Sequence, residues 1–278
     1  MASSNPAFNR SPAFSSNRDV AAKLQAGATG SVSSEGMTAA QLTDLYSVPS
    51  ATPSDTDRMT YEDTMVKIVT SFVILLVGAA VGWFFPVLAL PAALVGFVLA
   101  LVNIFKKKPS PALVLSYAAV EGIFVGGITV FLEPRLPGIA VQAVLGTLVV
   151  VGVTLALFAS GKIRASKKAT KVFLIAMIGY GVFSLINFIL MATGANSDAF
   201  GLRSAPIPFL SGLPFGVVLG VLVIIMAAYS LVLDFDSIQT GVKRGAPRIY
   251  GWTAAFGIMV TVVWLYPEIL RLLALLRR

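Results

Sequence analysis

The first apolar run of the chain reads VKIVTSFVILLVGAAVGWFF and covers residues 66–85. At a rise of about 1.5 Å per residue, a helix of this length spans about 30 Å, the thickness of the hydrocarbon core of a bilayer. Only a helix satisfies its own backbone hydrogen bonds there, so the run predicts a transmembrane helix. A second run, VLALPAALVGFVLALVNIF at residues 87–105, follows after Pro86 alone and predicts a tight hairpin between two crossings.

Five further apolar runs continue this pattern to residue 276. They cover residues 111–132, 139–160, 171–193, 212–233 and 256–276. The 278-residue chain is 56% hydrophobic and 12% charged, whereas a soluble domain carries about 25% charged residues. The sequence therefore predicts an all-α, polytopic, integral membrane protein with seven transmembrane helices within residues 61–278.

Residues 1–60 differ from the rest because they have no apolar period and are rich in Ser, Ala, Asn, Thr and Pro. This composition predicts a disordered tail. The tail contains a short repeat, NPAF at residues 5–8 and SPAF at residues 11–14. A plain linker is favoured over a docking motif for an unknown protein partner. The tail has no apolar segment typical of a cleaved signal peptide.

Basic residues are concentrated in alternate connections between the runs, at residues 106–108, 162–171 and 243–248. The positive-inside rule then places the N-terminal tail and these connections in the cytoplasm. We expect a bacterial plasma membrane, although the residues do not exclude an organelle. The basic surplus indicates contact with membrane lipids and not with nucleic acid. Seven crossings would place Arg277 and Arg278 outside the cytoplasm, against the positive-inside rule. A re-entrant last segment therefore remains an alternative.

The chain contains no histidine and no cysteine. Catalytic triads with histidine, thiol chemistry, disulfides and thiolate metal sites are thereby excluded, and we expect no enzyme activity and no cofactor. A bound metal would be a hard cation with oxygen ligands, such as Ca²⁺. Proton chemistry would depend mainly on carboxylates.

Four acids lie within or at the edge of apolar runs: Glu121, Asp234, Asp236 and Glu268. An ionisable group at bilayer depth costs about 2.5–3.5 kcal/mol on insertion scales, so a functional role is the default interpretation. Two alternatives remain open. Asp234 and Asp236 could be edge acids in contact with Lys243 and Arg244, and Glu121 could be a protonated carboxyl bonded to a hydroxyl of a neighbouring helix.

Two acidic motifs give the sequence a family resemblance. Residues 233–238 read LDFDSI at the end of the sixth run, and residues 265–273 read LYPEILRLL in the seventh. Together with the lysines after the second run and YAAVEGIFVGGIT at residues 117–129, these motifs resemble the Bax inhibitor family. The resemblance covers roughly residues 60–278 and leaves out the tail.

The resemblance implies six helices packed around a central seventh and a calcium leak controlled by a pH-sensing pair of acids. Asp234 and Glu268 would form this pair and a candidate Ca²⁺ site, and Asp236 and Glu121 would be supporting acids. One of the basic residues after the second helix would act as a latch on the pair, and the candidates are Lys106, Lys107 and Lys108. The sequence departs from the family pattern in having Glu268 in place of an aspartate, Pro267 before it, and lysine in place of an arginine latch.

Contact between the two acids requires a particular start for the last helix. Two residues on antiparallel neighbours are level when they are equally far from the turn between them. Asp234 and Glu268 are level if the last helix begins near Gly257, so we expect residues 245–256 to form a bent or interfacial segment. We also expect Pro267 to loosen the helix, because it removes the hydrogen bond to Val263.

The sequence thus favours a pH-sensitive cation leak, in which protons and calcium ions compete for a coupled pair of carboxylates. Two other functions remain open. A proton-coupled secondary transporter would accumulate its substrate against a gradient. A non-transporting membrane regulator would keep its activity in cells after both acids are neutralised.

Overall fold

The computed structural model describes residues 57–208 and 212–277, so the predicted disordered tail lies outside the described residues. The long helices in chain order are α4 (Tyr61–Phe84), α5 (Ala89–Phe105), α6 (Pro111–Leu132), α7 (Ile139–Ala159), α8 (Lys167–Ala192), α9 (Phe215–Lys243) and α10 (Gly251–Leu276). Short 3₁₀ turns precede three of them, namely η2 (Pro86–Leu88), η3 (Gly201–Ser204) and η5 (Arg248–Tyr250).

The prediction of seven membrane-spanning helices is confirmed, since seven helices of the described chain are long and apolar enough to cross a bilayer. Two boundaries near the acidic motifs differ from the expected ones. Helix α9 continues to Lys243, ten residues beyond the predicted end at Leu233, and α10 begins at Gly251. A residue at positive φ, Gly245 at 62°, makes the turn between them. The expected bent segment at residues 245–256 is therefore wrong in its second half, which is regular helix.

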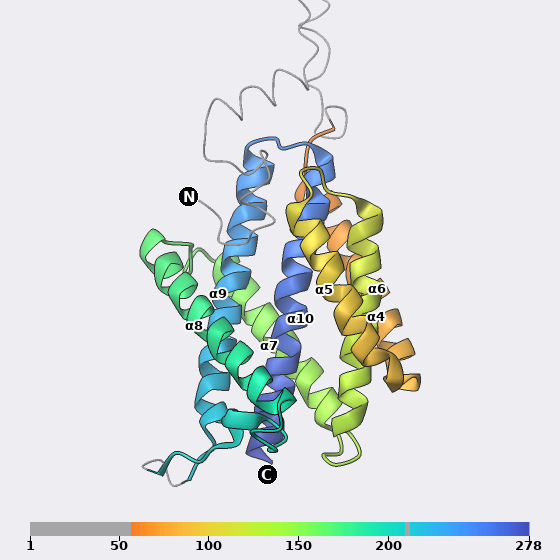
Figure 1. Ribbon diagram of the computed structural model, residues 1–278. Helices are drawn as coiled ribbons and strands as arrows, with labels where there is room; N and C mark the ends of the chain where they lie inside the picture. Colours follow the sequence, from red (N-terminus) through yellow and green to blue (C-terminus); the bar gives the residue numbers. More distant parts are fainter. Residues whose placement is uncertain (1–56, 209–211, 278) are drawn as a thin grey trace, which may run out of the picture.

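The connections lie at two ends of the bundle (Figure 1). We call the end with residues 106–110, 160–166 and 244–250 the basic end, and the other the far end. The C-terminus lies at the far end, where Arg277 donates a hydrogen bond of 3.1 Å to the carbonyl of Pro137. Helix α10 thus runs from one end to the other as one continuous helix, and the re-entrant alternative is wrong.

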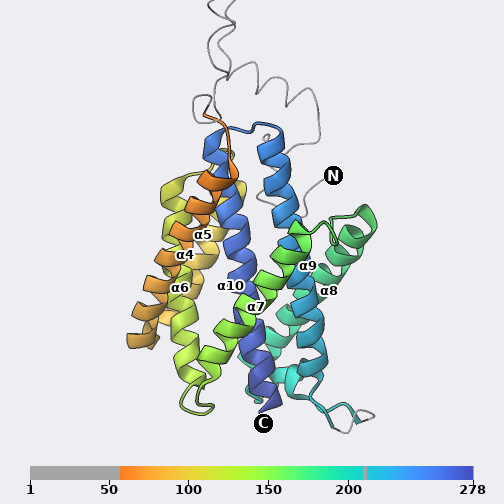
Figure 2. The same ribbon diagram turned by 180° about the vertical axis from the view of Figure 1, so that it is seen from behind.

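Helix α10 lies at the centre of the bundle and is the most buried of the seven (Figures 1 and 2). Its backbone packs mainly against α4, α6, α7 and α9, whereas α5 packs mainly on α6, and α8 on α9 and η3. The expected packing of all six helices around the seventh is not confirmed. Helix α8 has the least buried span of the seven, which leaves most of its surface to lipid.

Small residues allow α4 and α6 to pack closely. A Cβ placed on Gly78 of α4 would lie 2.3 Å from the carbonyl oxygen of Ala119, and one on Gly126 of α6 would lie 2.0 Å from that of Ala79. No side chain fits at these distances. The glycines of α6 therefore serve close helix packing, as their small size favours in membrane bundles.

The start of α4 is bound to the turn between α9 and α10. The amide of Met59 donates to the carbonyl of Ala246 at 2.7 Å, and the amide of Arg248 donates to that of Asp57 at 2.8 Å. The ammonium of Lys67 bonds the Arg248 carbonyl at 2.6 Å and forms an ion pair with Asp63. The first and last helices are thus joined at the basic end.

Candidate functional site

The central helix carries a buried ionic cluster around Glu268. Its carboxylate, on a residue that is 3% exposed, accepts a hydrogen bond of 3.0 Å from Arg203 in η3 and one from Arg271 one turn further along α10. The hydroxyl of Tyr180 in α8 donates to the same carboxylate. Glu268 therefore connects three elements that meet at the far end: α8, the α8–α9 connection and α10.

Arg203 is the residue that brings this connection into the bundle. It is 4% exposed, and its guanidinium also donates to Tyr180 at 3.0 Å and to Ser184 at 3.2 Å. It lies 5.3 Å from the centroid of the Tyr180 ring. Burial lowers the pKa of Arg203, but the Glu268 carboxylate and the Tyr180 hydroxyl together outweigh burial and hold that pKa above its ordinary value.

Tight backbone contacts fix the position of Arg203. Gly201 has a φ of 58°, and a Cβ there would lie 2.3 Å from the side-chain oxygen of Asn187 in α8. That oxygen accepts a hydrogen bond from the amide of Leu202 at 2.7 Å. On the other side, a Cβ on Gly216 of α9 would lie 2.8 Å from the Arg203 carbonyl. The η3 turn is thus packed so tightly between α8 and α9 that an added side-chain atom on either glycine would displace it.

Arg203 could not be selected from the sequence alone, because one arginine in an irregular connection has no periodic pattern. One signal was present. The connections that the positive-inside rule assigns to the outer face hold few charges, and an arginine is unusual there. Such a residue needs a partner, and Glu268 is the nearest acid that the far end of α10 provides.

Asp234 lies in a second, smaller polar cluster nearer the basic end. It is fully buried, and its carboxylate accepts a hydrogen bond of 2.7 Å from Thr261 of α10. Ser230, one turn earlier on α9, lies 3.2 Å from the same threonine hydroxyl. This cluster joins α9 to α10 through hydroxyl groups.

The expected contact between Asp234 and Glu268 is not formed. Asp234 bonds Thr261, which precedes Glu268 by two helical turns, or about 10 Å at helical rise. The reason is the early start of α10 at Gly251, which moves Glu268 away from the level of Asp234 toward the far end. The assumption that both acids lie equally far from the turn is therefore wrong.

Comparison with known families identifies the group of proteins to which the chain is related. The chain matches the family model described as Bax inhibitor 1 like over residues 5–278. The chain belongs to this family. The Bax inhibitor 1-like match includes most of the N-terminal tail, which the resemblance drawn from the motifs had left out. Among curated proteins, none matches the chain.

The supporting acids of this Bax inhibitor 1-like chain lie apart from both clusters. Asp236 is half-buried, and Arg164 and Lys243 interact with it electrostatically, in agreement with an acid at the edge of the membrane. Glu121 packs against α5, where a Cβ on Gly96 would lie 2.7 Å from a carboxylate oxygen. Its hydroxyl partner, Tyr117, lies on the same helix and not on a neighbouring one.

The latch expected from the family resemblance is not closed in this conformation. Lys106, Lys107 and Lys108 are all exposed, and none of them forms an ion pair within the described chain. Lys106 and Lys107 line a small hollow beside Thr253 and Phe256 of α10. These two residues precede Thr261, so the lysines lie on the basic-end side of Asp234.

The geometry also bears on the candidate Ca²⁺ site. Within residues 57–208 and 212–277, no three acidic side chains come together in a way that could hold a metal ion. Asp234 and Glu268 lie at different levels, so the described conformation offers each carboxylate separately. A shared site would need α9 to shift along α10 by about two turns.

Proposed function

We propose that this Bax inhibitor 1-like protein is a pH-sensitive cation leak, with Ca²⁺ as the candidate ion, in which Asp234 and Glu268 act at two levels. The observation that supports this proposal is the buried ion pair between Glu268 and Arg203, which fastens the far-end connection to the central helix. Both side chains are 4% exposed. The two acids would then act at separate sites and not as a directly coupled pair.

Protonation of Glu268 is the step that would open the far end. A neutral carboxyl no longer balances the charges of Arg203 and Arg271, and breaking a buried pair costs about 3–5 kcal/mol because the remaining charge is uncompensated. The η3 turn would then leave its position between α8 and α9. Acidification on the far side, which the positive-inside rule places outside the cytoplasm, would therefore favour the open state.

Asp234 would act as the ion site within the bundle. Its carboxylate is fully enclosed and faces Thr261, whose hydroxyl can be a further oxygen ligand. Oxygen ligands of this kind suit Ca²⁺, while a proton on Asp234 would remove the charge that attracts the ion. Protons would thus open the far end through Glu268 and compete with the cation at Asp234.

Calcium flux into proteoliposomes tests the two roles separately. Glu268→Gln is expected to raise the flux at neutral pH and flatten its pH profile, because the charge that holds Arg203 is permanently absent. Asp234→Asn is expected to lower the flux at every pH. Asp198→Asn changes an exposed acid of the same far-end connection and serves as the control. Unchanged flux and an unchanged pH profile in both variants would contradict the proposal.

The same preparation distinguishes the two other functions. Accumulation of an ion against its gradient would indicate a proton-coupled secondary transporter. Retention of cellular activity by the doubly neutralised variant, together with no flux in liposomes, would indicate a non-transporting regulator.

A further inference from the structure

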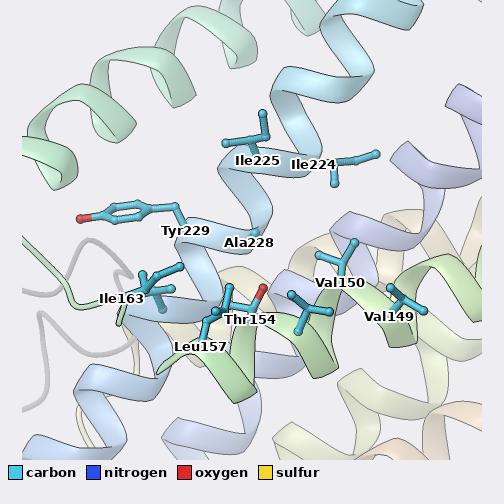
Figure 3. Close-up of a pocket in the computed structure, with 11 residues that line it drawn as sticks. Val149, Val150, Thr154, Leu157, Ile163, Ile224, Ile225, Ala228 and Tyr229 are labelled. Carbon is cyan, nitrogen blue, oxygen red and sulfur yellow. The ribbon is translucent and has the colours of Figure 1, made fainter. Parts of the chain in front are cut away.

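A second site lies away from the acids, on the lipid-facing side of α7 and α9. It is a groove of about 420 Å³ whose lining is almost entirely apolar (Figure 3). The residues that line it are Val149, Val150, Val153, Thr154, Leu157, Ile163, Ile224, Ile225, Ala228, Tyr229 and Val232. Several of them are open to the surroundings, such as Val149 at 61% and Ile225 at 61% exposure. The groove is therefore accessible from the bilayer.

The groove exists because α7 and α8 diverge from the short connection at residues 160–166. The two helices run along opposite sides of α9 (Figures 1 and 2), so the face of α9 between them is not covered. At the basic end the groove is closed by Ile163 and by Tyr229, whose hydroxyl lies 2.9 Å from that of Thr170. From Ile224 to Val232 the groove extends about 12 Å along α9.

Positive charge surrounds the closed end of the groove. Ile163 is flanked in sequence by Lys162 and Arg164, and Lys167, Lys168 and Lys171 belong to the first turns of α8. Arg164 is engaged with Gln239 of α9 at 3.2 Å and lies over the Phe158 ring. The four lysines are exposed, and in the part of the chain that the structure describes none of them forms an ion pair.

We propose that this groove binds one anionic phospholipid of the leaflet at the basic end. The acyl chain would lie in the groove along α9, and the phosphate would lie among Lys162, Lys167 and Lys168. An extended protein segment is disfavoured as the occupant, because its backbone would leave its own hydrogen bonds unsatisfied in a groove almost without polar groups. Charge complementarity selects an anionic lipid over a zwitterionic one, since each lysine near the surface contributes about 1 kcal/mol to such binding.

Native mass spectrometry of the full chain measures this binding directly, after incubation with equal amounts of phosphatidylglycerol and phosphatidylcholine. The wild type is expected to retain phosphatidylglycerol preferentially. Changing Lys162, Lys167 and Lys168 to glutamine is expected to weaken retention by about five-fold for each lysine removed. The matched control changes Lys106, Lys107 and Lys108 to glutamine, which removes equal charge at the same end and should leave retention unchanged.

The acyl chain is tested with a pair of substitutions of equal size. Ala228→Phe fills the groove and should abolish lipid retention, whereas Ala156→Phe adds the same ring at an exposed position of α7 outside the groove and should not. Glycerol phosphate in excess should not displace the lipid, because it lacks the chain. Equal retention of both lipids by the wild type, or equal retention by the two phenylalanine variants, would overturn the proposal.

Discussion

The two acidic clusters of α10 differ in the kind of group that surrounds each carboxylate. Glu268 lies among two guanidinium groups and a phenol, contributed by three elements. Asp234 accepts a hydrogen bond from the hydroxyl of Thr261 in α10, which lies 3.2 Å from the hydroxyl of Ser230 in α9. Both carboxylates are buried, and that of Glu268 forms ion pairs with Arg203 and Arg271.

This difference indicates that the two acids contribute differently to stability and to switching. Removing the charge of Glu268 leaves the buried Arg203 without balance, so the effect spreads to α8 and to the far-end connection. Removing the Thr261 hydroxyl takes away one hydrogen bond to Asp234 at the interface of α9 and α10. The following predictions test this contrast.

The largest effect is expected for Glu268→Gln, which preserves the shape of the side chain and removes its charge. We expect a loss of about 3–5 kcal/mol in unfolding free energy, because Arg203 stays buried without a carboxylate. Thermal unfolding in detergent measures this loss. Adding Arg203→Met to Glu268→Gln should recover most of it, since the unbalanced charge is then absent. A single variant as stable as the wild type would show that the ion pair does not hold the far end together.

A smaller effect is expected for Gly216→Ala, which tests whether the position of Arg203 depends on packing as well as on charge. The added Cβ would meet the Arg203 carbonyl at 2.8 Å and Leu275 at 2.5 Å. Displacement of the η3 turn should cost about 1–3 kcal/mol in unfolding free energy. Gly152→Ala in α7 is the control, because nothing lies within 4 Å of its added Cβ. There a glycine-to-alanine change should stabilise the helix by up to about 1 kcal/mol.

For the second cluster, Thr261→Val removes the hydroxyl that bonds Asp234 and keeps the branched shape. We expect a loss of about 1–3 kcal/mol in unfolding free energy, as is typical when a buried acceptor loses its donor. Thr154→Val in α7 is a matched control, since Thr154 is also buried but lies outside both clusters. A larger loss for Thr261→Val than for Glu268→Gln would reverse the contrast between the clusters.

The smallest effect is expected for Tyr180→Phe. The ring keeps its contacts with Trp264, at 5.9 Å between centroids, and with Arg203. The hydroxyl loses the hydrogen bond that it donates to Glu268 and the one that it accepts from Arg203, which together should cost about 1–2 kcal/mol in the same unfolding measurement. A loss as large as that of Glu268→Gln would mean that the phenol, and not the arginine, is the main partner of the carboxylate.

The sequence was sufficient to locate the seven helices, because each apolar run is long and the bilayer sets its length. The start of the last helix differs from the expected one near Gly257. Only the turn at residues 244–247 interrupts the chain there, and Gly251 and Gly257 both lie within α10. Pro267 is likewise accommodated inside the helix, which continues through it.

The two main acids could be chosen from the sequence because charged groups at bilayer depth are rare. The groups that each carboxylate contacts could not be chosen in this way. Arg203 reaches Glu268 only because of how the connection between α8 and α9 folds back between the helices, and the position of Gly201 next to Asn187 has no signature in the pattern of apolar residues. Helix register, and not residue type, decided which group each carboxylate meets.

The bonds between the start of α4 and the turn before α10 have a mechanical consequence. Asp57 and Met59 are held by Arg248 and Ala246 through backbone hydrogen bonds, just before the most enclosed helix of the bundle begins. Any force applied to the chain at residue 57 is therefore transmitted directly to the base of that helix. Residues 57–59 therefore couple the start of α4 mechanically to the most buried helix of the bundle.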